Sequence, residues 1–418
     1  MKLDLVQTLA LSGVLLFVGY GLQRLWPALA RLNIPAPVIG GLLASIALLI
    51  AHSRDWPLPQ FDTTLQQPLL VAFFTSIGYS ASLSLLKVGG PKVLTLLAVV
   101  TAFAVLQNLL GIVLAAGFGL PPLFGVLTGS VTLTGGPATG LAFAPLFEEA
   151  GITGASSIAI ASAMAGIVLG GLAGGPIGTM LIERHRLQGP GPGQQPPRSP
   201  AEAHAPVQAA QADASVPDAE AEIIEAADED SAQARVVLKT LVVVLAAMWI
   251  GAGISTALAM TGVTLPGYIG AMLAAAAIRN LDDYTGWIGL SHRAVDTLGA
   301  VALSLFLVMA LMTLDLTQLA GLAVPMIVML FAQLALVSVV CFWPVFQTMG
   351  RDYDAAVTTG GFLGFMLGTT ANAMAVMRTL VERYGAAPRA FLVAPLVGAF
   401  FVDFTNALII TVFLNLLG

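Results

Sequence analysis

Two Gly- and Thr-rich stretches interrupt the apolar sequence, one in each half, and they constrain the fold more than any other feature. Residues 127–140 read LTGSVTLTGGPATG, and residues 359–373 read TGGFLGFMLGTTANA. Each stretch follows a long apolar segment and leads to a short segment that ends in acid and glycine, at 148–151 and 382–385. Interrupted apolar segments at matching places in two halves are typical of the binding site of a secondary transporter. Irregular backbone at membrane depth is tolerated only where protein or water covers it.

The composition is that of a polytopic membrane protein. Hydrophobic residues make up 57% of the 418 residues and charged residues only 10%, whereas a soluble domain carries about 25% charged residues. The single cysteine, Cys341, lies in an apolar segment and is expected to be a small core residue. The first apolar run, residues 5–22, is long enough to span a bilayer and lacks a basic leader, so we expect it to be retained as a span.

Residues 187–234 differ from the rest of the chain because they combine Pro, Gly and Ala with many acidic side chains. This segment offers too little apolar surface to offset the entropy of ordering it, and we therefore expect a disordered acidic linker. A binding or regulatory tail is the alternative. The linker divides the chain into an N-terminal unit, residues 1–186, and a C-terminal unit, residues 235–418.

Each unit is expected to contain five membrane-spanning helices, because roughly 20 apolar residues are needed for one crossing. The expected spans are 5–22, 36–51, 68–86, 92–117 and 153–182, followed by 236–260, 265–280, 297–316, 320–346 and 388–416. A re-entrant hairpin lies between the fourth and fifth span of each unit, at about 121–149 and 354–382.

The two units resemble each other beyond their hairpins. The second spans begin alike, with IPAPVIGGLLA at 34–44 and LPGYIGAMLAA at 265–275. A repeated unit with an odd number of crossings must insert its second copy upside down. The prediction is therefore an all-α polytopic membrane protein built from two inverted-topology repeats, with chance similarity of apolar sequence as the alternative.

The distribution of basic residues predicts the orientation in the membrane. If the linker is cytoplasmic, all but Lys2 and Arg54 of the 17 Lys and Arg residues lie on the cytoplasmic side, as the positive-inside rule requires. Both termini are then extracytoplasmic. The first hairpin enters from outside and the second from the cytoplasm, so that their tips meet near the middle of the bilayer.

Oxygen-bearing side chains near the second hairpin and in the last span form a candidate Na⁺ site. Asp403 is the one acid deep in an expected span, which suggests a cation or proton partner. Asn406 lies three residues further on and shares its helix face. The candidate Na⁺ ligands are Asp403, Asn406, Thr405, Thr369 and Asn372. The alternative is a polar patch that packs between helices.

The helix starts in the hairpins are candidate sites for a carboxylate substrate. Pro137 suits a first helical position, and Thr370 or Asn372 is expected to cap the rising helix of the second hairpin. Both helix starts offer unpaired N–H groups and a positive dipole end. The candidate substrate-binding residues are Thr134, Gly135, Gly136, Pro137, Ala138, Thr139, Thr369, Thr370 and Asn372. Glycines at these positions are alternatively needed only for tight packing.

Three further polar residues have structural interpretations. Gln107 and Asn108 lie mid-span in the fourth crossing, where they either contact substrate or form helix-to-helix hydrogen bonds, and we favour the second. Asp354 is expected to cap the helix that enters the second hairpin.

No paired acids, activated nucleophile or metal-ligand spacing indicates an enzyme, and a single central site fits alternating access better than a channel.

The chain resembles the bacterial sodium/glutamate symporter family along both halves. The resemblance is carried by residues 349–375, by residues 391–408 (FLVAPLVGAFFVDFTNAL) and by LGGLAGGP at 169–176. It implies Na⁺-coupled uptake of L-glutamate across the bacterial inner membrane by a homodimer, in which a hairpin domain slides past a fixed scaffold. It implies no resident cofactor other than the coupling ion, no enzymatic activity and no nucleic-acid partner.

The first hairpin departs from the pattern of the family. Related sequences carry Gly-Gly-His-Gly-Thr at its tip, whereas this chain has Pro137 and Ala138 in place of the histidine and the following glycine. Another small carboxylate, such as aspartate or a hydroxycarboxylate, is therefore an alternative substrate. Coupling to H⁺ through Asp403 is an alternative to coupling to Na⁺.

Overall fold

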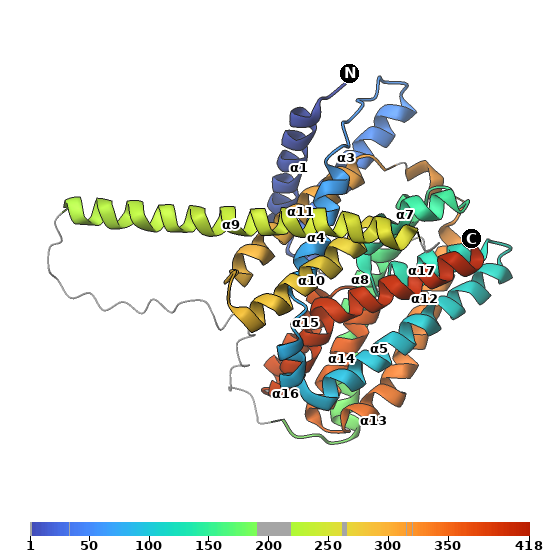
Figure 1. The fold of residues 1–418 in the computed structure, drawn as a ribbon. Coiled ribbons are helices and arrows are strands. Elements are labelled where there is room, and N and C mark those ends of the chain that lie inside the picture. The colour runs from blue at the N-terminus through green and yellow to red at the C-terminus, as the bar shows by residue number, and fades with distance from the viewer. Residues whose placement is uncertain (1, 33, 190–218, 261–265, 315, 320) are drawn as a thin grey trace.

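The computed structural model describes residues 2–32, 34–189, 219–260, 266–314, 316–319 and 321–418, and these residues are organised almost entirely as helices (Figure 1). Extended pairing within them is limited to an isolated parallel bridge between Lys2 and Gln60. The expected all-α fold is therefore confirmed for the described part of the chain.

The first half contains the long helices α1 (Leu5–Leu25), α3 (Ala36–Ser53), α5 (Leu83–Gly117) and α8 (Ala155–Arg184), shorter helices and one hairpin. The hairpin consists of α6 (Pro122–Val126), a π-helical turn η1 (Leu127–Val131) and α7 (Gly136–Glu149). The remaining elements are α2 (Pro27–Arg31) and α4 (Gln66–Tyr79). α5 is broken at Gly90, whose φ of 63° and ψ of −160° are not helical.

The second half also contains long helices and one hairpin. Its hairpin consists of α14 (Tyr353–Met366) and α15 (Thr370–Tyr384). Before it come α9 (Ala219–Ala259), α10 (Gly267–Thr285), α11 (His292–Met312), η2 (Leu316–Leu319), α12 (Ala323–Val340), η3 (Cys341–Val345) and α13 (Phe346–Met349), and after it come α16 (Pro388–Leu396), η4 (Val397–Phe401) and α17 (Val402–Leu417). Cys341 is fully buried, as expected of a core residue.

Seven of the described helices are long and apolar enough to cross a membrane, which is fewer than the ten expected spans. They are Leu5–Leu25, Ala36–Ser53, Gly90–Gly117, Ala155–Arg184, Ala234–Leu258, His292–Met312 and Ala323–Met349. The other expected spans fall on α4, which is only 14 residues long, on α10, which ends in charged residues, and on 388–416, which is broken at η4.

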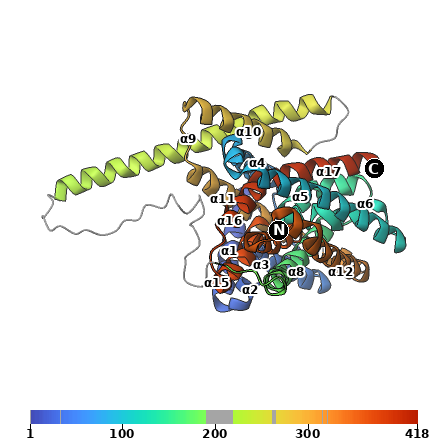
Figure 2. The ribbon, with the colours of Figure 1, turned by 90° about the horizontal axis from the view of Figure 1, so that it is seen from below.

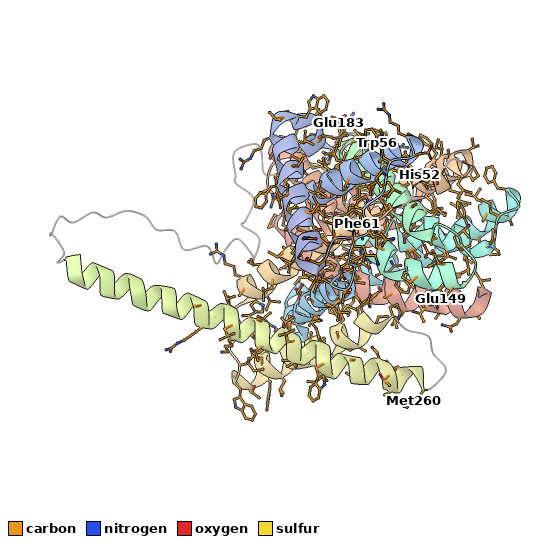
Figure 3. The ribbon with its side chains drawn as sticks, turned by 90° about the horizontal axis from the view of Figure 1, so that it is seen from above. His52, Trp56, Phe61, Glu149, Glu183 and Met260 are labelled. Atoms are coloured by element: carbon orange, nitrogen blue, oxygen red, sulfur yellow. The ribbon has the colours of Figure 1, made fainter. Side chains whose placement is uncertain are left out.

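The outer surface carries many large apolar side chains (Figure 3). Phe17 is 74% exposed, Trp249 80% and Met260 83%. Exposed apolar surface on this scale is unfavourable in water, and helices satisfy all their backbone hydrogen bonds internally, as the hydrocarbon core requires. The chain is therefore an integral membrane protein.

The boundary of the linker differs in part from the expectation. Residues 190–218 lie outside the described residues. Residues 219–234 are helical and form the beginning of α9, which projects beyond the rest of the described chain (Figure 1). The sequence of this segment is rich in Ala and Glu, which are strong helix formers, and it continues without a break into an apolar helix.

The helices form two packed groups. In the first, α4 packs against α10 and α11, while α1 and α9 lie on the outside against α3 and α10 (Figure 2). The second contains α5, α8, α12, α16, α17 and both hairpins. Phe74 of α4 and Tyr268 of α10 stack at 3.9 Å, and Phe143 of α7 meets the same tyrosine edge-on at 6.0 Å. These aromatic rings form one contact between the two groups.

Glycines of α8 form the surface against which the second hairpin packs, the seat of that hairpin. They occur at every fourth position, so they lie on one helix face. A Cβ atom added to Gly166 would lie 2.6 Å from the carbonyl oxygen of Leu367, and one added to Gly174 would lie 2.9 Å from both methyl groups of Val376. The absence of side chains on this face allows α14 and α15 to approach the α8 backbone closely.

Candidate functional site

The tips of the two hairpins lie in direct contact. The first tip is the turn between η1 and α7, and Gly136 at its end has a φ of 68°. The second tip is the turn between α14 and α15. A Cβ atom on Gly136 would lie 3.2 Å from Cγ2 of Thr369 and 3.4 Å from the carbonyl oxygen of Gly368. The two Gly- and Thr-rich stretches, although distant in sequence, therefore form one site.

The two rising helices begin differently. Gly135 is the N-cap of α7 and supplies no side-chain hydrogen bond, and Pro137 lies within the first two helical positions, as expected. In α15 the cap is Thr369, whose hydroxyl accepts a hydrogen bond from the N–H of Asn372 at 3.3 Å. The expectation that Thr370 or Asn372 caps this helix is wrong. The helix begins at Thr370, and an N-cap residue has extended backbone and immediately precedes the first helical residue, which places the cap at Thr369.

The cap of the entering helix α14 also differs from the expectation. Asp352 caps this helix and accepts from the N–H of Ala355 at 2.9 Å. Asp354 instead reaches the next segment, where it accepts from the N–H of Ala390 at 3.0 Å. Arg389 lies against both carboxylates. Burial raises the pKa of Asp352, but the hydrogen bonds and the charge of Arg389 outweigh it and lower the pKa below its ordinary value.

Two amide side chains of α5 bind the hairpin tips. Oε1 of Gln107 accepts from the hydroxyl of Thr134 at 2.6 Å, and its Nε2 donates to the carbonyl of Met366 at 2.8 Å. Oδ1 of Asn108 accepts from the N–H of Ser130 at 2.9 Å. The favoured interpretation as hydrogen-bonding residues is confirmed, although their partners are mainly in the hairpins rather than on a straight helix.

Ser130 is a residue of the site that the sequence analysis did not select. Asn108 holds its N–H, and Nδ2 of Asn406 donates to its carbonyl at 2.9 Å. The Ser130 hydroxyl and Oδ1 of Asn406 are buried and have no hydrogen-bond partner among the described residues. The backbone is broken beside them at Gly129, whose ψ is −125°. The position of Ser130 inside the first Gly- and Thr-rich stretch was the available signal.

The remaining candidate ion ligands are spread around the tips. Asn372 donates to the carbonyl of Ile167 in α8 at 3.1 Å, and Thr370 donates to the carbonyl of Gly398 in η4 at 3.1 Å. Thr405 bonds within its own helix, to the carbonyl of Phe401 at 2.7 Å. These contacts bring α15 to α8 and η4, whereas Asn406 faces the first hairpin.

Asp403 lies on the same turn of α17 as Asn406. Its carboxylate interacts electrostatically with the hydroxyl of Tyr268, and in the described part of the chain that hydroxyl is buried without a hydrogen-bond partner. Within the described ranges no cluster of three or more His, Cys, Asp and Glu side chains is suited to a transition metal. The carboxylate of Asp403 and the amide oxygen of Asn406 are hard oxygens, which suit a hard cation better than a soft metal.

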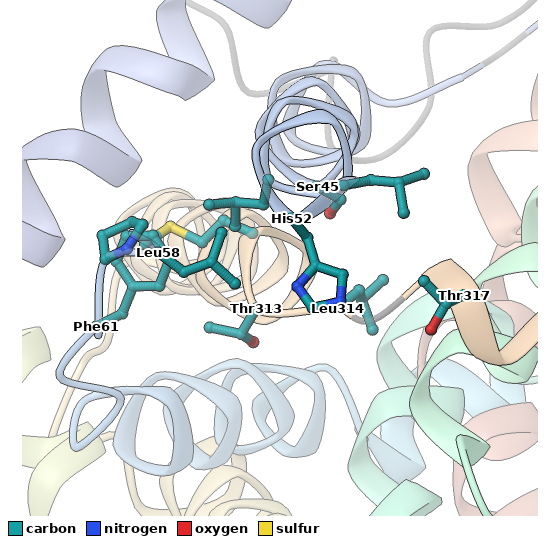
Figure 4. Close-up of a pocket in the computed structure, with 11 residues that line it drawn as sticks. Ser45, His52, Leu58, Phe61, Thr313, Leu314 and Thr317 are labelled. Carbon is teal, nitrogen blue, oxygen red and sulfur yellow. The ribbon is translucent and has the colours of Figure 1, made fainter. Parts of the chain in front are cut away.

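Two cavities lie away from the tips. One of about 330 Å³ is lined by the last turn of α3, including His52, by Phe61 and by the residues after α11, including Thr317 (Figure 4). Another of about 270 Å³ lies between α4, α7, α8 and α11 and is lined by Gln66 and Glu148 among others. Neither is lined by the candidate tip residues.

Comparison with known proteins decides the family. The family model for the sodium/glutamate symporter matches residues 1–386. The chain belongs to the sodium/glutamate symporter family. It is 38% identical to the sodium/glutamate symporters of Escherichia coli K12 and Shigella flexneri over 99% of this chain and 98% of theirs. It is 35% identical to that of Haemophilus influenzae over 97% of this chain and 96% of the relative.

Membership in the sodium/glutamate symporter family confirms the resemblance that the motifs indicated. This is a family of transporters, so the protein is a transporter rather than an enzyme. The family match includes both hairpins, and the match to the Escherichia coli symporter extends over nearly the whole chain.

Proposed function

We propose that this protein is a Na⁺-coupled glutamate symporter of the bacterial inner membrane. Family membership supports the substrate and the ion, since the relatives are named sodium/glutamate symporters. The observation that carries the proposal is the contact between Gly136 and Thr369, which joins two broken helices in one site. Broken helices that meet within the membrane are the usual binding site of secondary transporters.

The two halves are inverted repeats in this proposal. The packing supports it, because α1 lies against α3 and α11, and α9 lies against α10 and α4. Exchanging each helix for its counterpart converts the first set of contacts into the second. The hairpins are re-entrant from opposite faces, the termini are extracytoplasmic and the segment 187–234 is cytoplasmic, which agrees with the distribution of basic residues.

The first tip is assigned to a carboxylate group of glutamate. The start of α7 has no side-chain cap, so its first N–H groups and its positive dipole end are available to an anion. Thr134, Thr139, Thr369 and Thr370 supply hydroxyl groups on both sides of the tip contact. Gly135 and Gly136 let the substrate approach the backbone.

The coupling ion is assigned to oxygen atoms around Asp403. Asp403 supplies the charge, and Thr405, Asn406, Thr369 and Asn372 supply neutral oxygens, as a hard cation prefers. The buried Ser130 hydroxyl and Oδ1 of Asn406, which lack partners, extend this set. Binding Na⁺ next to Asp403 would offset the cost of a carboxylate at membrane depth.

Transport proceeds by an elevator-type movement in this proposal. The hairpins and the helices around them pack as one group, and the group of α3, α4, α10 and α11 forms the scaffold. The aromatic contact of Phe143 with Tyr268 lies between the two groups. Phe143, the partner from the moving group, is apolar, and the contact can therefore break and re-form as the groups slide. A homodimer would anchor the scaffold against this movement.

A second candidate substrate is another small carboxylate, aspartate or a hydroxycarboxylate. The observation that favours it is the presence of Pro137 and Ala138 at the first tip. Proline removes one backbone N–H from the start of α7 and fixes its φ, which changes the set of donors available to the substrate.

Uptake into proteoliposomes tests the proposal. We expect labelled glutamate to accumulate when an inward Na⁺ gradient is imposed and not when a proton gradient of equal size replaces it. Unlabelled aspartate and hydroxycarboxylates compete in the same assay and rank the substrates. Uptake that follows only the proton gradient, or no glutamate uptake at all, would contradict the proposal.

A further inference from the structure

Gln107 connects the two hairpin tips through a single side chain. The hydroxyl of Thr134 in the first tip donates to its Oε1 at 2.6 Å, and its Nε2 donates to the carbonyl of Met366 in the second at 2.8 Å. Thr134 is 5% exposed, and Gln107 and Met366 are fully buried. Water is therefore excluded from these bonds. The Thr134 hydroxyl also lies 3.9 Å from the sulfur of Met366, a long contact that shares its single proton with the shorter bond to Gln107.

The position of the amide is itself fixed. Nε2 of Gln333 in α12 donates to the carbonyl of Gln107 at 2.8 Å, and the neighbouring Asn108 holds the N–H of Ser130. The helix α5 is therefore attached to α12 and to the first hairpin on either side of the Gln107 side chain. A buried amide that is held in this way has one orientation in which both of its polar groups are satisfied.

We propose that Gln107 is the positioning residue that sets the spacing of the two hairpin tips and so couples the ion site to the substrate site. The inference rests on the proposed symport function. It goes beyond it by assigning the coupling to one side chain that is neither an ion ligand nor a substrate ligand. A displacement of α14 on ion binding moves the carbonyl of Met366, and the Gln107 amide transmits that movement to Thr134.

The chemistry of the bridge specifies which substitutions it tolerates. One atom must accept from Thr134 and another must donate to Met366, so an amide satisfies both partners and a methionine of similar length satisfies neither. A carboxylic acid that carries its proton also has one acceptor and one donor. After ionisation it has acceptors only, and it then faces the Met366 carbonyl without a hydrogen between them.

The titratable groups on the elements around Gln107 are few. α12 and η1 carry none that is charged, and the acid of α14, Asp354, lies at the opposite end of that helix. On the other packed elements are Arg389 in α16 and Asp403 in α17, and α5 itself carries Lys87 and Lys92 near its beginning. The uptake rate of a Gln107→Glu variant is therefore divided by the wild-type uptake rate measured at the same pH.

The experiment compares Gln107→Glu, Gln107→Met and Gln333→Met with the wild type in Na⁺-driven glutamate uptake into proteoliposomes. Wild-type uptake tests the symport function independently of the inference. For Gln107→Met we expect at least a tenfold loss of Vmax/KM, with the half-saturating Na⁺ concentration and the glutamate KM rising together. Gln333→Met is the comparison variant, because it removes only the support of the Gln107 backbone and neither tip bond. We therefore expect a smaller loss of Vmax/KM than in Gln107→Met.

Gln107→Glu supplies a result that a purely structural role would not give. We expect its uptake relative to wild type to be retained at low pH and to fall as the pH rises, while its elution on size exclusion stays constant. A variant that follows the wild-type pH profile at reduced rate throughout, or a Gln107→Met protein with normal Na⁺ dependence, would overturn the inference. If Gln107→Met does not fold, Thr134→Val breaks the same bridge from its other end. Because Thr134 is also a candidate substrate residue, the half-saturating Na⁺ concentration is then the deciding measurement, and it must rise.

Discussion

Gly136 of the first hairpin and Thr369 of the second touch across the centre of the molecule, with a Cβ on the glycine only 3.2 Å from Cγ2 of the threonine. Residues separated by more than half of the chain therefore form a single surface. Neither tip has space for a larger side chain, and the glycine has a positive φ that L residues rarely adopt.

Replacing Gly136 by alanine is expected to abolish glutamate uptake. The added methyl group would both crowd Thr369 and strain the backbone by about 1–2 kcal/mol. Gly151 is the matched control, because its φ of 93° is also positive but nothing lies within 4 Å of its Cβ position. Uptake and thermal unfolding are measured for both variants. Equal loss of uptake in both would assign the effect to backbone strain and not to the tip contact.

Gly174, on the glycine face of α8, and its neighbour Gly175, off that face, are expected to respond differently to substitution by alanine. A Cβ on Gly174 would lie 2.9 Å from the Val376 methyl groups, whereas nothing lies within 4 Å of the Cβ position of Gly175. Gly174→Ala should destabilise the protein by about 1–3 kcal/mol through overpacking. Gly175→Ala should be neutral or stabilising by up to about 1 kcal/mol. Thermal unfolding in detergent measures both, and similar melting temperatures would refute the seat for the second hairpin.

Asp403→Asn is expected to reduce Na⁺-stimulated uptake at least tenfold, because it removes the charge that would hold the ion and keeps the shape of the side chain. The protein should still elute as a folded species in detergent. Glu149→Gln is the control, since Glu149 is an exposed acid at the end of α7 (Figure 3). Full Na⁺-dependent activity of the Asp403 variant would remove this residue from the ion site.

Ser130→Ala is expected to raise the half-saturating Na⁺ concentration several-fold and leave the melting temperature unchanged. Within the described ranges, the Ser130 hydroxyl makes no hydrogen bond that the substitution could break. Ser162→Ala is the matched control, because Ser162 in α8 also has a buried hydroxyl without a partner. An unchanged Na⁺ dependence in Ser130→Ala would show that this oxygen is not an ion ligand.

Asp352 is expected to contribute stability that depends on pH. Asp352→Ala removes the cap of α14 and should cost about 1 kcal/mol at neutral pH, whereas Asp352→Asn keeps a good cap and loses only the ion pair with Arg389. The folded pKa lies below the unfolded value of about 3.9. The contribution is therefore complete above about pH 4 and is lost as the pH falls through the folded pKa.

Thermal unfolding between pH 3 and pH 7 measures this effect. The difference in melting temperature between wild type and Asp352→Ala should shrink on the acidic side. A difference that stays constant over this range would mean that the carboxylate charge of Asp352 has no part in stability.

Much of the candidate site could be predicted from local sequence. The strings TLTGG and LGTT marked both turns, since glycine and threonine permit the broken backbone and cap the helix that follows. The apolar segments located α1, α3 and α8 within a few residues at each end. They did not locate the end of α4 at Tyr79 or the early start of α9 at Ala219. Pro137 was also correctly placed at a helix start, because its fixed φ suits that position.

Other features could not be predicted because their partners are distant in sequence. The cap of α14 is Asp352 and not Asp354, and the two acids are indistinguishable until the start of the helix and the position of Arg389 are known. Gln107 was recognised as a hydrogen-bonding residue, but its partners Thr134 and Met366 are set by the way both hairpins pack on α5.

The sequence by itself determined the membrane environment, most of the long helices and the two turns, because hydropathy, glycine and capping residues act over a few neighbouring positions. Only the tertiary structure decided that the turns touch, that α8 seats the second hairpin and that Ser130 has a free hydroxyl. These features depend on distances between segments hundreds of residues apart, and such distances are fixed only when the whole set of helices packs together.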